Sequence, residues 1–211
     1  MIPLPRHRYQ SGLLLAFVLL ALASLVGSPF PRDQLVQHVP TAIAVVCLLA
    51  ITRRVPLTDF SFTLVVVFLA LHALGARYIY SYVPYDRWAS AVFGATITET
   101  FGFHRNHYDR LVHLSFGLLL TIPIHEVVTR VIAPPRAWGY VLAVALNMVG
   151  SVLYELGEAL VALTFAPDWA DRYLGQQGDP WDSHRDMALA TAGAVVAATA
   201  KALWPYRFRR S

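Results

Sequence analysis

Acidic and histidine side chains recur at helical spacing in this 211-residue chain, and the clearest pair is Asp109 with His113. A spacing of four residues puts both side chains on one face of a helix. Such a pair can hold a divalent metal, or it can form a carboxylate–imidazole hydrogen bond that fixes the histidine tautomer. A local hydrogen bond with a helix cap by Asp109 is the simpler alternative. We favour a functional pair, because His113 lies too deep to serve as a cap.

A second polar stripe lies in an otherwise apolar segment. Four residues follow one another at offsets of four, four and three, so they share a helix face. They are Asn147, Ser151, Glu155 and Glu158. Polar side chains within a membrane helix point into the bundle rather than toward lipid, and we expect Glu155 to be functional. The alternative is a structural ion pair with an arginine such as Arg110, although a buried ion pair is weak evidence for stability.

A third polar segment precedes the last apolar run. Asp179, Pro180 and Asp182 fit ordinary helix-start chemistry as N-cap, first helical residue and first-turn acid. Asp186 is not explained in this way, because it lies one turn deeper. Asp182 and Asp186 present two carboxylates on one face, as a hard cation or a general acid–base pair requires. Small residues follow and favour close helix packing. They are Ala190, Gly193, Ala194 and Ala197, with Gly117 in the same role after His113.

Together these segments predict one site. The expected catalytic residues are Asp109, His113, Glu155, Asp182 and Asp186. The expected ligands of a divalent metal ion are Asp109, His113, Glu155 and Asp186. The arginines expected to hold an anionic substrate group are Arg77, Arg110 and Arg185. His72 is a weaker candidate ligand, because a single histidine in a membrane helix is often just hydrogen-bonded to a neighbour.

Composition assigns the chain to the membrane proteins. Hydrophobic residues make up 56% and charged residues 14%, against about 25% charged residues in a soluble domain. A helix needs roughly 20 apolar residues to cross the hydrocarbon core, and the long apolar runs lack the alternation of barrel strands. We therefore expect an all-α integral membrane protein, a single domain over residues 1–211 that forms a six-helix transmembrane bundle. The expected helices cover about residues 11–27, 34–51, 61–80, 110–132, 137–165 and 187–204.

The segments between these helices carry further expectations. Two long connections, residues 81–109 and 166–186, are of the kind that is often functional. A single cysteine, Cys47, allows no intrachain disulfide and argues against a thiolate metal site. Residues 11–27 are alternatively a cleaved signal peptide, with the same topology downstream. Aromatic residues near the end of the third segment fit a belt at the membrane interface. They are Tyr80, Tyr82, Tyr85 and Trp88.

Lysine and arginine predict the orientation, because positively charged loops stay in the cytoplasm. With the amino terminus inside, the inner loops hold ten cations against two acids, a net charge of +8, and the outer loops hold seven against eleven, a net charge of −4. We therefore expect both termini in the cytoplasm and the acidic cluster outside. The high pI reflects this orientation and not nucleic-acid binding. The inner cations are Arg6, Arg8, Arg53, Arg54, Arg130, Arg136, Lys201, Arg207, Arg209 and Arg210.

The polar segments also carry a family likeness. Three stretches of sequence carry it. One is His72-Ala-Leu-Gly-Ala-Arg-Tyr, followed by Pro84. Another runs from Arg105 to Arg110 and continues to His113 and Gly117. The third is Tyr154-Glu155 with the stretch from Tyr173 to Asp182 and Asp186-Met187. They resemble the YjdF-type family of bacterial multi-pass inner-membrane proteins, which is catalogued as a domain of unknown function. The resemblance spans most of the chain beyond the first two helices and implies a bacterial inner-membrane location.

A looser likeness is to the VanZ-like membrane proteins, which are associated with glycopeptide resistance. Asp109 with His113, then Glu155, then Asp182 with Asp186 follow the order of their motifs. Arg110 stands where those proteins tend to have lysine, and the asparagine of their last motif has no match after Asp186. Likeness at the level of the fold does not establish function.

Three functions remain open. In the first, which we favour, the cluster binds a divalent metal that polarises a phosphoryl or acyl oxygen of an envelope lipid, as in a hydrolase or transferase. No metalloprotease or hydrolase signature accompanies it. In the second, the polar stripe conducts an ion or a small solute, although no inverted repeat is visible. In the third, the protein is an accessory subunit whose charges form ion pairs. The expected partner is the lipid bilayer, and protein partners stay open.

Overall fold

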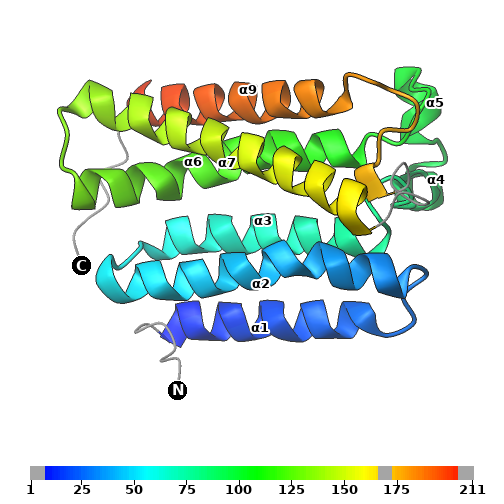
Figure 1. The fold of residues 1–211 in the computed structure, drawn as a ribbon, viewed down its shortest axis with the longest axis horizontal. Coiled ribbons are helices and arrows are strands. Elements are labelled where there is room, and N and C mark those ends of the chain that lie inside the picture. The colour runs from blue at the N-terminus through cyan, green and yellow to red at the C-terminus, as the bar shows by residue number, and fades with distance from the viewer. Residues whose placement is uncertain (1–7, 166–172, 204–211) are drawn as a thin grey trace.

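The computed structural model describes residues 8–165 and 173–203, and over these ranges it is helical with no β-strand. Six helices are long and apolar enough to cross a membrane, which confirms the predicted number. They are α1 (Arg8–Leu25), α2 (Pro31–Arg54), α3 (Asp59–Arg77), α6 (Tyr108–Val131), α7 (Arg136–Phe165) and α9 (Asp182–Leu203) (Figure 1). The basic residues 207–210 and part of the 166–186 connection lie outside the described residues.

Long helices that follow one another in the chain run in opposite directions along one common axis (Figure 1). Two short helices, α4 (Tyr85–Phe93) and α5 (Ile97–Phe101), lie at one end, which we call the α4–α5 end. Both α6 and α9 start at this end and therefore run parallel, whereas α7 returns toward it. Because α1 begins and α9 finishes at the opposite end, the described parts of the chain start and stop on the same side of the bundle.

The 81–109 connection is more ordered than a loop. Gly94 and Gly102 end α4 and α5 in the left-handed region, with φ of 74° and 64°, as glycine C-caps commonly do. The carboxylate of Asp86 in α4 accepts hydrogen bonds from both the backbone N–H, at 2.9 Å, and the hydroxyl of Thr98 in α5. This link joins the two helices, which are too short to cross a bilayer.

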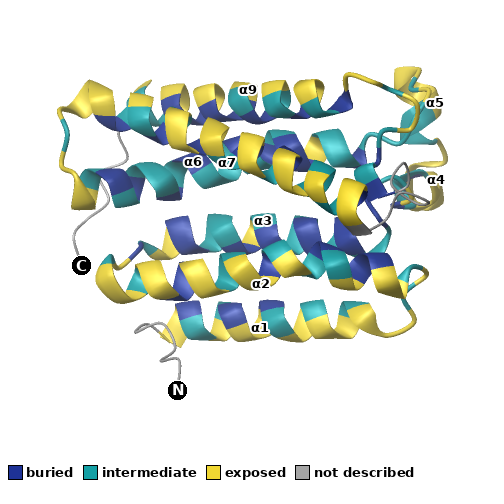
Figure 2. Ribbon diagram, in the orientation of Figure 1, coloured by how far each residue is buried: buried dark blue, intermediate teal, exposed yellow. Residues whose placement is uncertain are grey.

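Two groups of three helices make up the bundle. In one group α1 and α2 each pack against α3, and in the other α6, α7 and α9 pack against one another. Contact between α3 and α6 joins the groups, and α2 with α7 is not among the closely packed pairs. The outward faces expose large apolar side chains such as Leu15 and Leu163 (Figure 2). Such faces fit contact with lipid tails.

The contact between α6 and α9 is close enough to exclude side chains. A Cβ atom on Gly117 would lie 2.0 Å from the carbonyl oxygen of Ala190, and a Cβ atom on Gly193 would lie 2.4 Å from a backbone oxygen of α6. The small-residue face predicted for α9 is therefore confirmed. Since the helices run parallel, the residues one turn before this contact also face each other. These are His113 on α6 and Asp186 on α9.

Candidate metal centre

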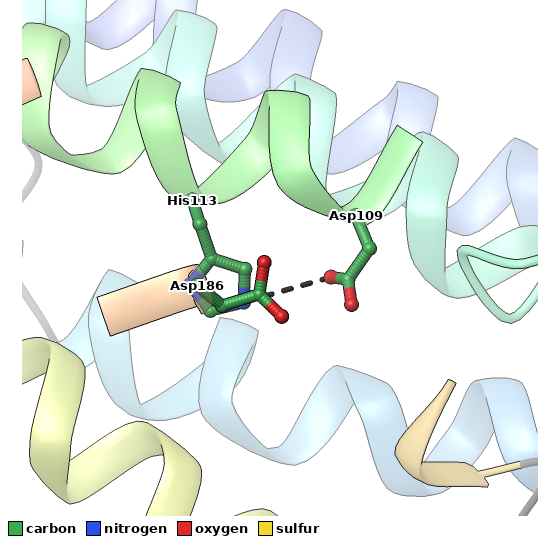
Figure 3. A group of neighbouring side chains, drawn as sticks. All are labelled: Asp109, His113 and Asp186. Carbon is green, nitrogen blue, oxygen red and sulfur yellow. Dashed lines mark ion pairs between the residues drawn. The ribbon is translucent and has the colours of Figure 1, made fainter. Parts of the chain in front are cut away.

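Four polar side chains from three helices converge at the α4–α5 end. Asp109 and His113 of α6 and Asp186 of α9 each offer a ligand atom, and these atoms lie within 4.8 Å of one another (Figure 3). The Nε2 atom of His113 is 3.5 Å from Oδ1 of Asp109. It is also 3.3 Å from Oε1 of Glu155, which α7 brings in from the side. The structure thus groups Asp109, His113 and Asp186 and places Glu155 beside His113. We call these four residues, which the sequence predicts as metal ligands, the metal cluster.

The metal cluster is buried, but its hydrogen bonding is incomplete. Asp186 is 2% exposed and Glu155 is 9% exposed. Among the described residues, Oδ1 of Asp186 and Oε1 of Glu155 have no hydrogen-bond partner. A buried polar atom without a partner costs about 1–3 kcal/mol, and more if the group is charged. Three carboxyl groups around one imidazole therefore need further positive charge, which protons or a divalent cation can supply.

A layer of ion pairs covers the metal cluster on the side of the α4–α5 end. Arg105, which precedes α6, donates to both oxygens of Asp182 at 2.6 and 3.0 Å and to the carbonyls of Gly175 and Gln176. Burial opposes the charge of Arg105, but the hydrogen bonds and charge of Asp182 outweigh it and hold the pKa of Arg105 above its usual value. Asp182, expected among the catalytic residues, is thus paired with Arg105 through both oxygens. It is not part of the metal cluster.

Two of the arginines expected to hold substrate belong to the same layer. Arg110 donates to Asp179 at 2.9 Å, and Arg185 donates to the same carboxylate oxygen at 2.6 Å. The other oxygen of Asp179 accepts the backbone N–H of Trp181 at 3.1 Å, as a cap at the start of α9. The side chain of Arg185 is 55% exposed, against 21% for Arg110. Both guanidinium groups therefore belong to the ion-pair layer around Asp179, and Arg185 is the more accessible of the two.

The third of these arginines lies elsewhere. The guanidinium of Arg77 donates to the backbone carbonyls of Ser24, Val26 and Gly27, in the last turn of α1 and the turn that follows. Carbonyls at a helix C-terminus lack partners within the helix. Arg77 satisfies them and ties the end of α3 to α1. Its described contacts place it with the α1–α2 turn and not with the metal cluster.

A hydrogen-bonded pair, His72 and Tyr80, lies close to the metal cluster within the bundle. Nε2 of His72 lies 3.0 Å from the carbonyl oxygen of Gln37, which can only accept, so Nε2 carries the proton. Nδ1 of His72 therefore accepts the hydroxyl hydrogen of Tyr80. Because both ring nitrogens are engaged, His72 is a buried structural histidine and not a free ligand.

Tyr80 corrects one expectation from the sequence. The sequence predicts it in the aromatic belt, but it is 5% exposed and points into the bundle. Its backbone is left-handed, with φ of 48°, and its ring fills the space beside Gly75, where a Cβ atom would lie 2.6 Å away. This reversal ends α3 at Arg77. Burial, followed by the charge of Asp109, raises the pKa of Tyr80, so its hydroxyl keeps the proton that it donates.

An apolar cavity of about 200 Å³ adjoins the metal cluster. It lies between α2, α3, α6 and α7 and includes Ala44, Phe68 and Phe116 in its lining. His113 lines it as well, so this residue belongs to both the cavity and the metal cluster. Neither Asp, Glu, Lys nor Arg lines it among the residues that the structure describes.

Comparison with known proteins agrees with this architecture. The model of the family described as "Predicted membrane protein (DUF2238)" matches residues 9–207, a range that includes every residue of the metal cluster. The inner membrane protein YjdF of Escherichia coli (strain K12) is 34% identical over 163 residues, which are 77% of this chain and 74% of that protein. No solved structure matches. The chain is therefore a multi-pass membrane protein and belongs to the DUF2238 family of predicted membrane proteins.

Proposed function

We propose that the protein is a metal-dependent enzyme that hydrolyses an envelope lipid or transfers a group to or from it. The metal cluster of Asp109, His113, Glu155 and Asp186 would hold one divalent cation. The observation that carries the proposal is the convergence of these ligands around buried carboxylate oxygens that lack hydrogen-bond partners among the described residues. A divalent cation would bind those oxygens and offset their charge.

The ligand types narrow the choice of metal. Carboxylate oxygens suit magnesium and manganese, and an imidazole nitrogen suits zinc and other transition metals. A mixed set of one histidine and up to three carboxylates fits Mn²⁺ or Zn²⁺. If Asp109, His113 and Asp186 bind the metal directly, with Glu155 beside His113, three protein ligands keep a position for water or substrate. The metal would polarise a phosphoryl or acyl oxygen there, or lower the pKa of a bound water.

The surroundings of the metal cluster support a lipid substrate. Asp109, His113 and Asp186 lie within the first two turns of α6 and α9, near the level where lipid head groups meet the bilayer core, and Glu155 lies about three turns before the end of α7. Arg110 and Arg185 lie in the ion-pair layer next to the cluster and are partly exposed, and arginine binds phosphate through paired charge-assisted hydrogen bonds. From the distribution of lysine and arginine we infer that this end faces away from the cytoplasm and that both termini face into it.

An accessory role is the second candidate, and one observation favours it. Asp182, in the layer outside the metal cluster, has both of its carboxylate oxygens bound by Arg105. Charges that serve only to hold helices together are paired in this way. We assign that role to the outer layer alone, because the carboxylate oxygens of the metal cluster are not paired to the same extent.

Metal content tests the proposal. The protein is purified in detergent without chelators, loaded with Mn²⁺ or Zn²⁺, desalted, and measured by elemental mass spectrometry. We expect about one metal ion per chain in the wild type and none in Asp186→Asn. Glu126→Gln, which alters a buried acid at the opposite end, serves as the matched control and should retain the metal.

The same samples are then incubated with defined phospholipids, and the products are separated by mass spectrometry. Turnover by the wild type that depends on metal, and is lost in Asp186→Asn, is the expected result. If metal fails to bind the wild type, or binds Asp186→Asn equally well, the metal cluster is not a metal site. Ion pairing would then be its role.

A further inference from the structure

The apolar cavity beside the metal cluster is too small for a whole lipid. Its volume is about 200 Å³, whereas pockets that enclose a drug-sized ligand measure roughly 300–1,000 Å³. It is lined by apolar side chains over most of its length, including Ala44, Phe68 and Phe116. An apolar cavity of this kind stays dry and takes up apolar groups. A single hydrocarbon chain is therefore the class of ligand that fits.

The length of the cavity matches one leaflet of a bilayer. On α6 the lining runs from Val112 to Leu120, and on α3 it runs back from His72 to Val65. At 1.5 Å per residue these spans are about 10–12 Å long. Half of the hydrocarbon core measures about 15 Å. A chain that starts at the level of the metal cluster and follows the bundle axis would thus occupy most of the depth of its own leaflet.

We propose that this cavity binds one acyl chain of a membrane phospholipid from the leaflet at the α4–α5 end. The chain enters sideways between α2 and α7, two helices that line the cavity and are not among the closely packed pairs of the bundle. The inference rests on the proposed function for the position of the head group, which lies at the metal cluster. Binding of the chain itself requires neither metal nor turnover.

One polar group inside the cavity supports an ester-linked chain. Ser151 lines the cavity and is 2% exposed, and its hydroxyl has no hydrogen-bond partner among the described residues. It lies four residues from Glu155 on α7, which is about 6 Å deeper along the helix. A hydroxyl at this depth can donate a hydrogen bond to the ester carbonyl of a chain whose head group reaches the metal cluster. The polar contacts thus fix the depth of the chain, and the apolar lining holds the rest of it.

Photochemical labelling tests the proposal. The full-length protein is reconstituted in vesicles that contain phosphatidylglycerol with a diazirine near the middle of one acyl chain, irradiated, digested and mapped by mass spectrometry. We expect labelling of Phe68 and Phe116, which line the cavity. Ala44→Phe fills the cavity from α2, and Ala42→Phe places the same ring on the exposed face of that helix as the matched control. Labelling of the cavity should fall about tenfold in Ala44→Phe, the change that roughly 1.4 kcal/mol of overpacking produces, and stay unchanged in Ala42→Phe.

Two further variants separate loss of chain binding from misfolding and from loss of metal. Ser151→Leu fills the cavity from α7 and replaces Ala44→Phe if that variant does not fold. Asp186→Asn should lose metal but keep the labelling, so a failed metal site and a failed chain site give different results. Labels confined to outward residues such as Leu153 and Leu156 would overturn the proposal. Displacement of the label by a polyprenyl phosphate, and not by unlabelled phosphatidylglycerol, would overturn it as well.

Discussion

The two ends of the bundle each bury acidic side chains, but the hydrogen bonding of these side chains differs between the ends. At the opposite end, Glu126 of α6 is 8% exposed. One of its oxygens accepts from the Thr58 N–H at 2.9 Å and from Arg130 at 2.6 Å, and the other accepts from the Thr58 hydroxyl at 2.9 Å. At the α4–α5 end, Asp186 is 2% exposed, and its Oδ1 atom has no partner among the described residues.

The same contrast occurs within α9. Asp182 and Asp186 lie one turn apart and are buried to the same extent, at 2% exposed each. Asp182 has both oxygens bound by Arg105, whereas Asp186 lies beside the carboxyl group of Asp109 and the imidazole of His113. Burial alone therefore does not separate the two acids. Their hydrogen bonding does, because Arg105 binds both oxygens of Asp182 while Oδ1 of Asp186 has no partner among the described residues.

Removal of Arg105 should have the largest effect on stability. Arg105→Gln leaves Asp182 buried without its bidentate partner, and breaking a buried pair in this way costs about 3–5 kcal/mol. The unfolding temperature in detergent should fall by several degrees relative to Arg87→Gln, which removes an exposed arginine of α4. Equal stability of the two variants would show that the outer layer does not hold the α4–α5 end together.

Neutralising the two contrasted acids should change stability in opposite directions. Glu126→Gln loses charge-assisted hydrogen bonds worth about 1.5–3 kcal/mol each and should destabilise the protein. Asp186→Asn, measured in the presence of a chelator, removes a carboxylate that lacks a partner, so its stability should equal or exceed that of the wild type. Chemical unfolding of both variants in detergent measures the difference. A destabilised Asp186→Asn protein under chelator would identify Asp186 as a structural carboxylate.

A side chain added at the close contact between α6 and α9 should weaken both the packing of these two helices and the binding of metal. In Gly117→Ala the added Cβ atom meets the carbonyl of Ala190 at 2.0 Å, and overpacking of this kind costs about 1–3 kcal/mol. It also moves His113 away from Asp186, so the metal content should fall. Gly157→Ala is the matched control, because a Cβ atom on Gly157 meets no atom within 4 Å. A Gly117→Ala protein with full metal content would show that the α6–α9 contact does not set the geometry of the metal cluster.

Removal of Arg185 should have the smallest effect on stability. Its side chain is 55% exposed, and exposed ion pairs contribute about 0–1 kcal/mol. Arg185→Ala should unfold at nearly the wild-type temperature and keep its metal, while the KM for an anionic lipid rises. An unchanged KM would exclude Arg185 from the proposed substrate contacts and leave Arg110 as the remaining candidate.

Much of the architecture follows from local sequence. The six spans and the close α6–α9 contact were predictable, because apolar length and small-residue spacing are local properties. The spacing of Asp109 and His113 placed them on one face, and the depth of Glu155 and Asp186 within their helices placed them near that pair.

Other features depend on contacts between distant residues. Arg105 lies 77 positions from Asp182, so spacing gave no sign that it would bind this carboxylate and leave Asp186 unpaired. Tyr80 followed an apolar run and fitted an interfacial position, but a left-handed backbone turns it back against Gly75. Helices α4 and α5 are too short to give a clear periodic signal. Which acids remain unpaired is therefore a property of the assembled bundle.

The most direct test of the central claim is the thermal stability of the wild type and Asp186→Asn with and without added Mn²⁺ or Zn²⁺. A ligand that binds only the folded state stabilises it by about 2.7 kcal/mol at 100 times its Kd. We predict a metal-dependent rise of the unfolding temperature in the wild type and in Glu126→Gln, and no rise in Asp186→Asn. The same rise in all three proteins, or in none, would contradict the proposal that the metal cluster at the α4–α5 end binds a metal ion.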